Sequence, residues 1–171
     1  MKAFVFSGYL LRNARLEVRL AYTAFLVLSG VGLATMAAFQ LLHVGPTPAQ
    51  AAAYYRGGER AGELLFGKTA RQLLEVTHFH AFTMAIVYLV MAHLVIATGA
   101  SERTKRAAIV AGAVGLAGDV GAPWLVRFVS PAFAWLLVAA WIAEWAAFAA
   151  FVFCPLREMW FTNGRRTLPP E

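Results

Sequence analysis

The stretch that decides the fold is VTHFHAFTMAIVYLVMAHLVIATG, from Val76 to Gly99, which contains no Asp, Glu, Lys or Arg. Its length exceeds the ~20 apolar residues that a helix needs to cross the hydrocarbon core of a bilayer. Three of the four histidines of the chain, His78, His80 and His93, lie inside it. Ionisable side chains at membrane depth are costly and mark functional sites. The stretch therefore predicts a membrane-spanning helix that carries a binding site.

On a regular helix these histidines point in different directions. His78 and His93 fall within ~60° of each other and lie ~22 Å apart along the axis, whereas His80 points more than ~150° away from His78. We therefore expect His78 and His93 to share one face, next to the small residues Ala85 and Ala92. This face would leave room for a planar cofactor.

The composition places the chain among integral membrane proteins. It has 171 residues, of which 60% are hydrophobic and only 14% charged, whereas charged residues make up ~25% of average soluble domains. We expect one all-α domain, residues 1–171, built as a four-helix transmembrane bundle. The single cysteine, Cys154, excludes an internal disulfide and a cysteine-based metal cluster. The basic residues flank apolar segments, so they indicate membrane topology and no nucleic-acid partner.

Four apolar segments predict the spans, and polar segments separate them. The spans are expected at about 20–43, 73–98, 107–126 and 131–154. Residues 1–19 suit a short helix lying in the membrane interface. The long connection 44–72 predicts a helical outer loop, with short helices at 47–55 and 59–66, and loops of this length are usually functional. Tyr54 and Tyr55 are expected there as interfacial anchors.

The basic residues predict the orientation of the bundle. If both termini are cytoplasmic, ten of the 15 Lys and Arg residues lie inside and five lie outside, which follows the positive-inside rule. The inner group is Lys2, Arg12, Arg15, Arg19, Arg103, Lys105, Arg106, Arg157, Arg165 and Arg166. The outer group is Arg56, Arg60, Lys68, Arg71 and Arg127. We therefore expect a multi-pass protein of a bacterial-type inner membrane with both termini in the cytoplasm.

Histidines from two spans and a carboxylate from a third are expected near the outer face. His43 ends the first span, His78 and His80 begin the second, and Asp119 lies near the end of the third. Imidazoles from facing helices are suitable axial ligands for haem b. We expect His43 and His78 to ligate the haem iron, and His80 to bond a haem propionate, the outer loop or Asp119.

The pair His78 and His93 resembles membrane-bound b-type cytochromes, in which one helix supplies haem ligands near both membrane faces. The resemblance covers the first two spans and implies electron transfer by haem b. An inner haem held by His93 would need Met36, Met91, a second protomer or another subunit as its other ligand.

Two further interpretations of these residues stay open. His43, His78, His80 and Asp119 offer nitrogen and oxygen ligands that suit a bare copper, zinc or iron ion. The chain would then be a metal-handling protein or an enzyme. Alternatively, it is a non-catalytic subunit or an assembly factor of a respiratory complex. Glu144, in the fourth span, is a candidate for a proton relay, and without a cation beside it we expect it to be uncharged.

Our preferred hypothesis is a membrane electron-transfer protein that holds haem b. Its expected partners are quinone, a periplasmic redox protein, and a second copy of the chain or other membrane redox subunits. No phosphate-binding loop, nucleophile elbow or metalloprotease helix is present in the sequence, which argues against a hydrolase of soluble substrates.

Overall fold

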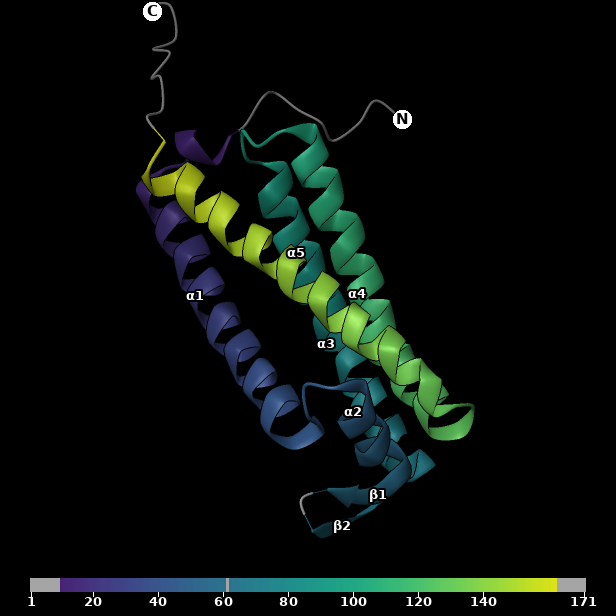
Figure 1. Ribbon diagram of the computed structural model, residues 1–171. Coiled ribbons are helices and arrows are strands. Elements are labelled where there is room, and N and C mark those ends of the chain that lie inside the picture. Colours follow the sequence, from purple (N-terminus) through teal and green to yellow (C-terminus); the bar gives the residue numbers. More distant parts are fainter. Residues whose placement is uncertain (1–9, 61, 163–171) are drawn as a thin grey trace, which may run out of the picture.

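Four long helices dominate the computed structural model, which describes residues 10–60 and 62–162 (Figure 1). Each of them is long and apolar enough to cross a membrane. The spans are α1 (Leu16–Phe39) with the π-helical turn η2 (Gln40–Val44), α3 (Ala70–Ile96), α4 (Glu102–Phe128), and the 3-10 turn η3 (Pro131–Phe133) with α5 (Ala134–Trp160). The predicted all-α membrane bundle with four spans is confirmed.

Each span extends a few residues beyond its predicted apolar segment at one end at least, because local signals set the ends. Thr69 caps α3 by accepting a hydrogen bond from the backbone of Gln72, whose side chain bonds back to Thr69. Ser101 caps α4 in a similar way through Thr104. Such caps satisfy the free N–H groups of a first helical turn. Charged end turns can therefore stay helical while they leave the hydrocarbon core.

The centre of the bundle is the contact between α4 and α5, which is the most extensive in the protein. A Cβ atom at Gly115 would lie 2.8 Å from the backbone nitrogen of Glu144, and one at Gly118 would lie 2.5 Å from Cβ of Ala140. Small residues thus let the two backbones approach closely, as is common in membrane helices. α1 is different: only Leu26 and Leu33 are buried along it, so it lies at the side of the bundle (Figure 1).

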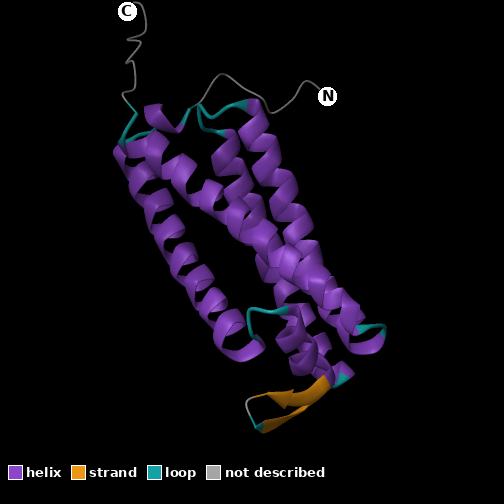
Figure 2. Ribbon diagram, viewed as in Figure 1, coloured by secondary structure: helices purple, strands orange, loops and turns teal. Residues whose placement is uncertain are grey.

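The connection between α1 and α3 is only partly as predicted. Its first part is α2 (Pro48–Arg56), which matches the helix expected at 47–55. The helix expected at 59–66 is wrong: an antiparallel hairpin of β1 (Gly57–Arg60) and β2 (Glu63–Phe66) lies there (Figure 2). Glycines explain the difference, because Gly57 and Gly62 have φ of 89° and 82°. These values favour glycine and end a helix or form a tight turn.

Hydrogen bonds fasten this connection to the end of α4. The guanidinium of Arg56 donates to the carbonyls of Val126 and Arg127 at 2.9 and 3.2 Å. Arg127 in turn donates to the carbonyl of Lys68 at 2.6 Å. The carbonyls at a helix C-terminus need such donors. α2 and the hairpin therefore close one end of the bundle (Figure 1).

The opposite end gathers the start of α1, the α3–α4 connection and the end of α5. The interfacial helix expected at 1–19 is replaced, in its described part, by one 3-10 turn, η1 (Leu11–Asn13), before α1 starts; residues 1–9 lie outside the described residues. Leu11 is buried and donates its backbone N–H to Ala97 at 2.9 Å. The buried leucine and this hydrogen bond hold the turn against the α3–α4 connection.

Candidate functional site

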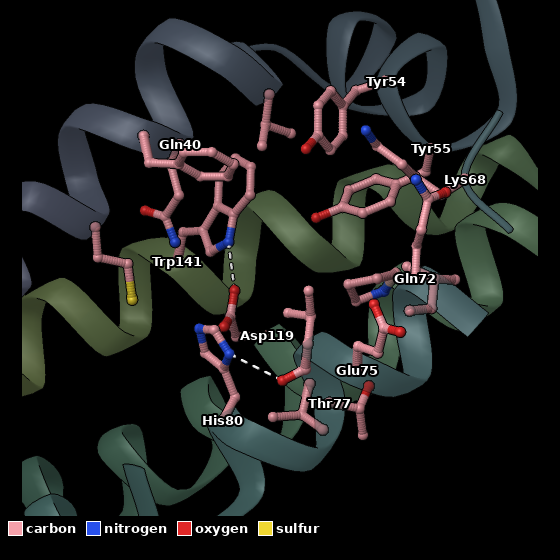
Figure 3. A pocket seen from close by; sticks show the side chains of 17 residues that line it. Gln40, Tyr54, Tyr55, Lys68, Gln72, Glu75, Thr77, His80, Asp119 and Trp141 are labelled. Atoms are coloured by element: carbon pink, nitrogen blue, oxygen red, sulfur yellow. Dashed lines mark hydrogen bonds between the residues drawn. The ribbon is translucent and has the colours of Figure 1, made fainter. Parts of the chain in front are cut away.

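A cavity of about 420 Å³ lies at the end of the bundle that α2 and the hairpin close. All four spans and α2 contribute to its wall, and the segment before α3 adds Lys68. The apolar wall residues are Met36, Phe39, Val44, Leu73, Val76, Val120 and Pro123. The polar wall residues are Gln40, Tyr54, Tyr55, Lys68, Gln72, Glu75, Thr77, His80, Asp119 and Trp141 (Figure 3). A mostly apolar cavity with a few convergent polar groups is typical of a small-molecule site.

His80 is the histidine that lines this cavity. Its Nδ1 lies 3.0 Å from the carbonyl oxygen of Val76, one turn earlier in α3. Because a carbonyl only accepts hydrogen bonds, Nδ1 carries the hydrogen. In the neutral ring, Nε2 is therefore left as a hydrogen-bond acceptor or a metal ligand. The backbone of α3 thus fixes both the orientation and the tautomer of a potential proton acceptor.

Asp119 lies on α4, beside the ring of His80 (Figure 3). The indole of Trp141, on α5, donates a hydrogen bond to its Oδ1 at 2.8 Å. The bond fixes the carboxylate and leaves Oδ2 to other partners. The expected position of Asp119 at the depth of His80 is confirmed. The imidazole and the carboxylate lie side by side in the cavity wall, where each can take up or release a proton.

Two tyrosines of α2 cover the cavity from the opposite side (Figure 3). Burial raises the pKa of the Tyr55 phenol well above its usual value, and the nearby Asp119 and Tyr54 raise it further. Tyr55 therefore remains an O–H donor at neutral pH. The ammonium of Lys68 lies 4.1 Å from the ring centre of Tyr54, a cation–π contact. The sequence had suggested only interfacial anchoring for these tyrosines.

Gln40 brings the first span into the site. It is buried and begins the π-helical turn, where its carbonyl accepts a hydrogen bond from Gly45 at 2.8 Å. Its side-chain oxygen accepts another from the indole of Trp145 at 3.1 Å. Wide helical turns of this kind are frequent at functional sites. An amide inside a charge-free span was the available sequence signal, and sequence reasoning missed it.

The other three histidines are exposed on the surface of the bundle. His43 packs against the ring of Phe39, and His78 packs between Phe79 and Phe82. His93 places Nδ1 2.7 Å from the carbonyl oxygen of Leu89. The expected facing of the second span is therefore wrong: His80 points to the cavity, and His78 points to the outside.

The predicted four-residue ligand set does not come together. Among the described residues, no group of three or more His, Cys, Asp or Glu side chains is placed to hold a metal ion. Of the four predicted ligands, His80 and Asp119 line the cavity, whereas His43 and His78 do not. Met36, considered above only for an inner haem, lies in the same cavity wall as His80.

The candidate relay residue, Glu144, lies outside the cavity wall but close to it. It is fully buried on α5, one turn after Trp141. Its neighbours one turn further along α5, Ala147 and Phe148, are also buried.

Comparisons with known proteins place the chain by family. Residues 45–166 match a family described as a transmembrane helical domain. No curated protein and no solved structure matches the chain. The matched part contains α2, the hairpin and the last three spans, and so all of the cavity wall except the part from α1 and η2. Because the match covers well over half of the 171 residues, the protein belongs to this family of transmembrane helical domains.

Proposed function

We propose that the protein binds a quinone-class hydrogen carrier in the cavity and exchanges protons with it as part of a membrane electron-transfer system. The observation that carries this proposal is that His80 and Asp119 lie together in the wall of an amphipathic cavity formed by all four spans and α2. Reduction of a quinone takes up electrons and protons together. A quinone site therefore needs groups that accept and release protons next to an apolar surface for the ring.

The chemistry of the wall suits both forms of such a ligand. Quinone carbonyls accept hydrogen bonds, which the phenol of Tyr55 and the ammonium of Lys68 can donate. Quinol hydroxyls donate hydrogen bonds, which Nε2 of His80 and Oδ2 of Asp119 can accept. The apolar wall residues, Phe39 among them, can contact the ring face. The electrons are then exchanged with a redox partner, such as another membrane subunit or a soluble redox protein.

Haem b is the second candidate occupant of the same cavity, and one observation favours it. Haem-ligating histidines usually donate their second ring N–H to a carbonyl or a carboxylate, and His80 does so to Val76. Met36 lies in the same wall, and its thioether would be the second group to hold the iron. In this alternative His80 and Met36 take the place of the expected pair His43 and His78.

A titration of the purified protein in lipid nanodiscs tests the proposed function. Added decylubiquinone should quench the fluorescence of the tryptophans near the cavity with saturation at micromolar concentration, whereas decanol should not. A colourless preparation that shows this quenching supports the quinone site. A red preparation with a Soret band that shifts on reduction supports haem b instead. A colourless preparation without saturable quenching contradicts both.

We also propose that the cavity lies near the outer face of the membrane, because the basic residues are in excess at the other end of the bundle. In a background with Cys154 replaced by alanine, a cysteine introduced at Glu63 in the hairpin should react with a membrane-impermeant maleimide added outside intact cells. A cysteine at Glu102, at the start of α4, should react only after lysis. The reverse pattern would place the cavity at the cytoplasmic face.

A further inference from the structure

Glu144 occupies the closest contact between α4 and α5. Glu144 is 0% exposed, and Gly115 of α4 lies directly against it. A Cβ atom at Gly115 would be 2.8 Å from the backbone nitrogen of Glu144 and 2.9 Å from its Cα and Cβ atoms. A glycine on α4 is thus what allows this helix to approach the backbone of α5 so closely at Glu144.

The carboxyl group of Glu144 has no polar partner. Neither Oε1 nor Oε2 has a hydrogen-bond partner within residues 10–60 and 62–162. None of the salt bridges of this part of the chain involves Glu144. A buried, unsatisfied polar group destabilises a fold, and an ionised one would do so far more. An apolar side chain of similar size would avoid this cost, so the carboxyl group indicates a function.

Its position connects Glu144 to the cavity. Glu144 follows Trp141, the hydrogen-bond donor to Asp119, by one turn of α5, and Asp119 follows Gly115 by one turn of α4. Asp119 and Glu144 therefore lie one turn apart along the contact between α4 and α5. Two other elements place polar side chains near Asp119: His80 of α3 faces it, and the neutral Gln40 of η2 lines the same cavity. Glu144 is therefore the next protonatable group behind the cavity wall.

We infer that Glu144 is a proton-storage site that exchanges one proton with Asp119. The inference rests on the proposed function, because a quinone that takes a proton from Asp119 would receive it in turn from Glu144. In the exchange, the O–H bond of the Glu144 carboxyl group breaks and an O–H bond forms on the Asp119 carboxylate. No electrons move, and the reverse step refills the store. The apolar surroundings favour the filled form.

Infrared spectroscopy of the ligand-free protein in nanodiscs tests this inference without the quinone. A protonated, buried carboxyl group gives a C=O stretching band that shifts in D2O. We expect such a band in the wild type at neutral pH and its loss in Glu144→Gln. Glu158→Gln is the matched control, since Glu158 is also buried on α5 but lies at the other end, 3.8 Å from Arg12. This variant should keep the band.

The rate at which the C=O band shifts after transfer to D2O distinguishes a proton-storage site from a buried acid that does not exchange its proton with Asp119. If Asp119 is the route, Asp119→Asn should slow the exchange of the Glu144 proton for deuterium by about tenfold or more, because a positioned acid–base group is lost. An unchanged rate in Asp119→Asn would overturn the inference, as would a missing band in the wild type. These readouts need no ligand, so failure of quinone binding leaves them interpretable.

Discussion

Replacing His80 by alanine is expected to weaken the binding of decylubiquinone by about tenfold or more, while His78→Ala leaves it unchanged. The loss of one hydrogen bond to a buried polar ligand costs ~1–3 kcal/mol, and 1.4 kcal/mol corresponds to about tenfold in Kd. Tryptophan fluorescence titration of the two variants measures the effect. The two substitutions remove the same side chain from the same helix, two residues apart, so His78→Ala controls for the loss of an imidazole as such.

The same pair of variants distinguishes the two candidate occupants. If the cavity holds haem b, His80→Ala should remove the Soret band and His78→Ala should keep it, because only His80 lines the cavity. Equal effects of the two substitutions on ligand binding would contradict the assignment of the site to this cavity. A protein bleached by His78→Ala and by His43→Ala would support the pair expected from the sequence.

The difference between His78 and His80 shows what the sequence of α3 can and cannot predict. Its length and apolar composition predict a span, since these properties decide whether a helix crosses a membrane. The sequence does not predict which side of α3 faces the bundle. Lipid and protein interior are both apolar, so a helix in the core of the bilayer can be apolar on all sides. A tertiary contact decides it: the indole of Trp124, on α4, donates a hydrogen bond to Thr77 at 2.9 Å.

The cavity itself could be predicted only in part for a similar reason. Asp119 and His80 were expected at one depth because depth follows from residue number along straight helices. The role of Gln40 depends on the π-helical turn, which the hydrophobic pattern does not predict. The role of Tyr55 depends on the hydrogen bonds between Arg56 and the end of α4, which are long-range contacts. The hairpin was missed because Leu64 and Leu65 suit either a helix or a strand, whereas Gly57 and Gly62 decide for the strand pair.

Asp119→Ala is expected to reduce stability and to slow proton uptake at the cavity, whereas Asp119→Asn should only slow the proton uptake. Alanine leaves the indole N–H of Trp141 buried without its acceptor, which costs ~1–3 kcal/mol. Asparagine keeps an oxygen for this bond, 2.8 Å long in the native protein, but cannot bind a proton at neutral pH. Thermal unfolding in nanodiscs measures the first effect, and proton uptake during electrochemical reduction of bound decylubiquinone measures the second.

A second pair of variants isolates the hydrogen bond between Trp141 and Asp119. Trp141→Phe removes the donor and should release the carboxylate, so proton uptake persists while ligand affinity falls. Trp135→Phe, one to two turns earlier on α5 and 71% exposed, is the matched control and should change neither quantity. If Asp119→Asn destabilised the protein as much as Asp119→Ala, the negative charge of Asp119 would be holding the bundle together. The pair of His80 and Asp119 would then be a structural contact, and the protons of the ligand would have to come from elsewhere.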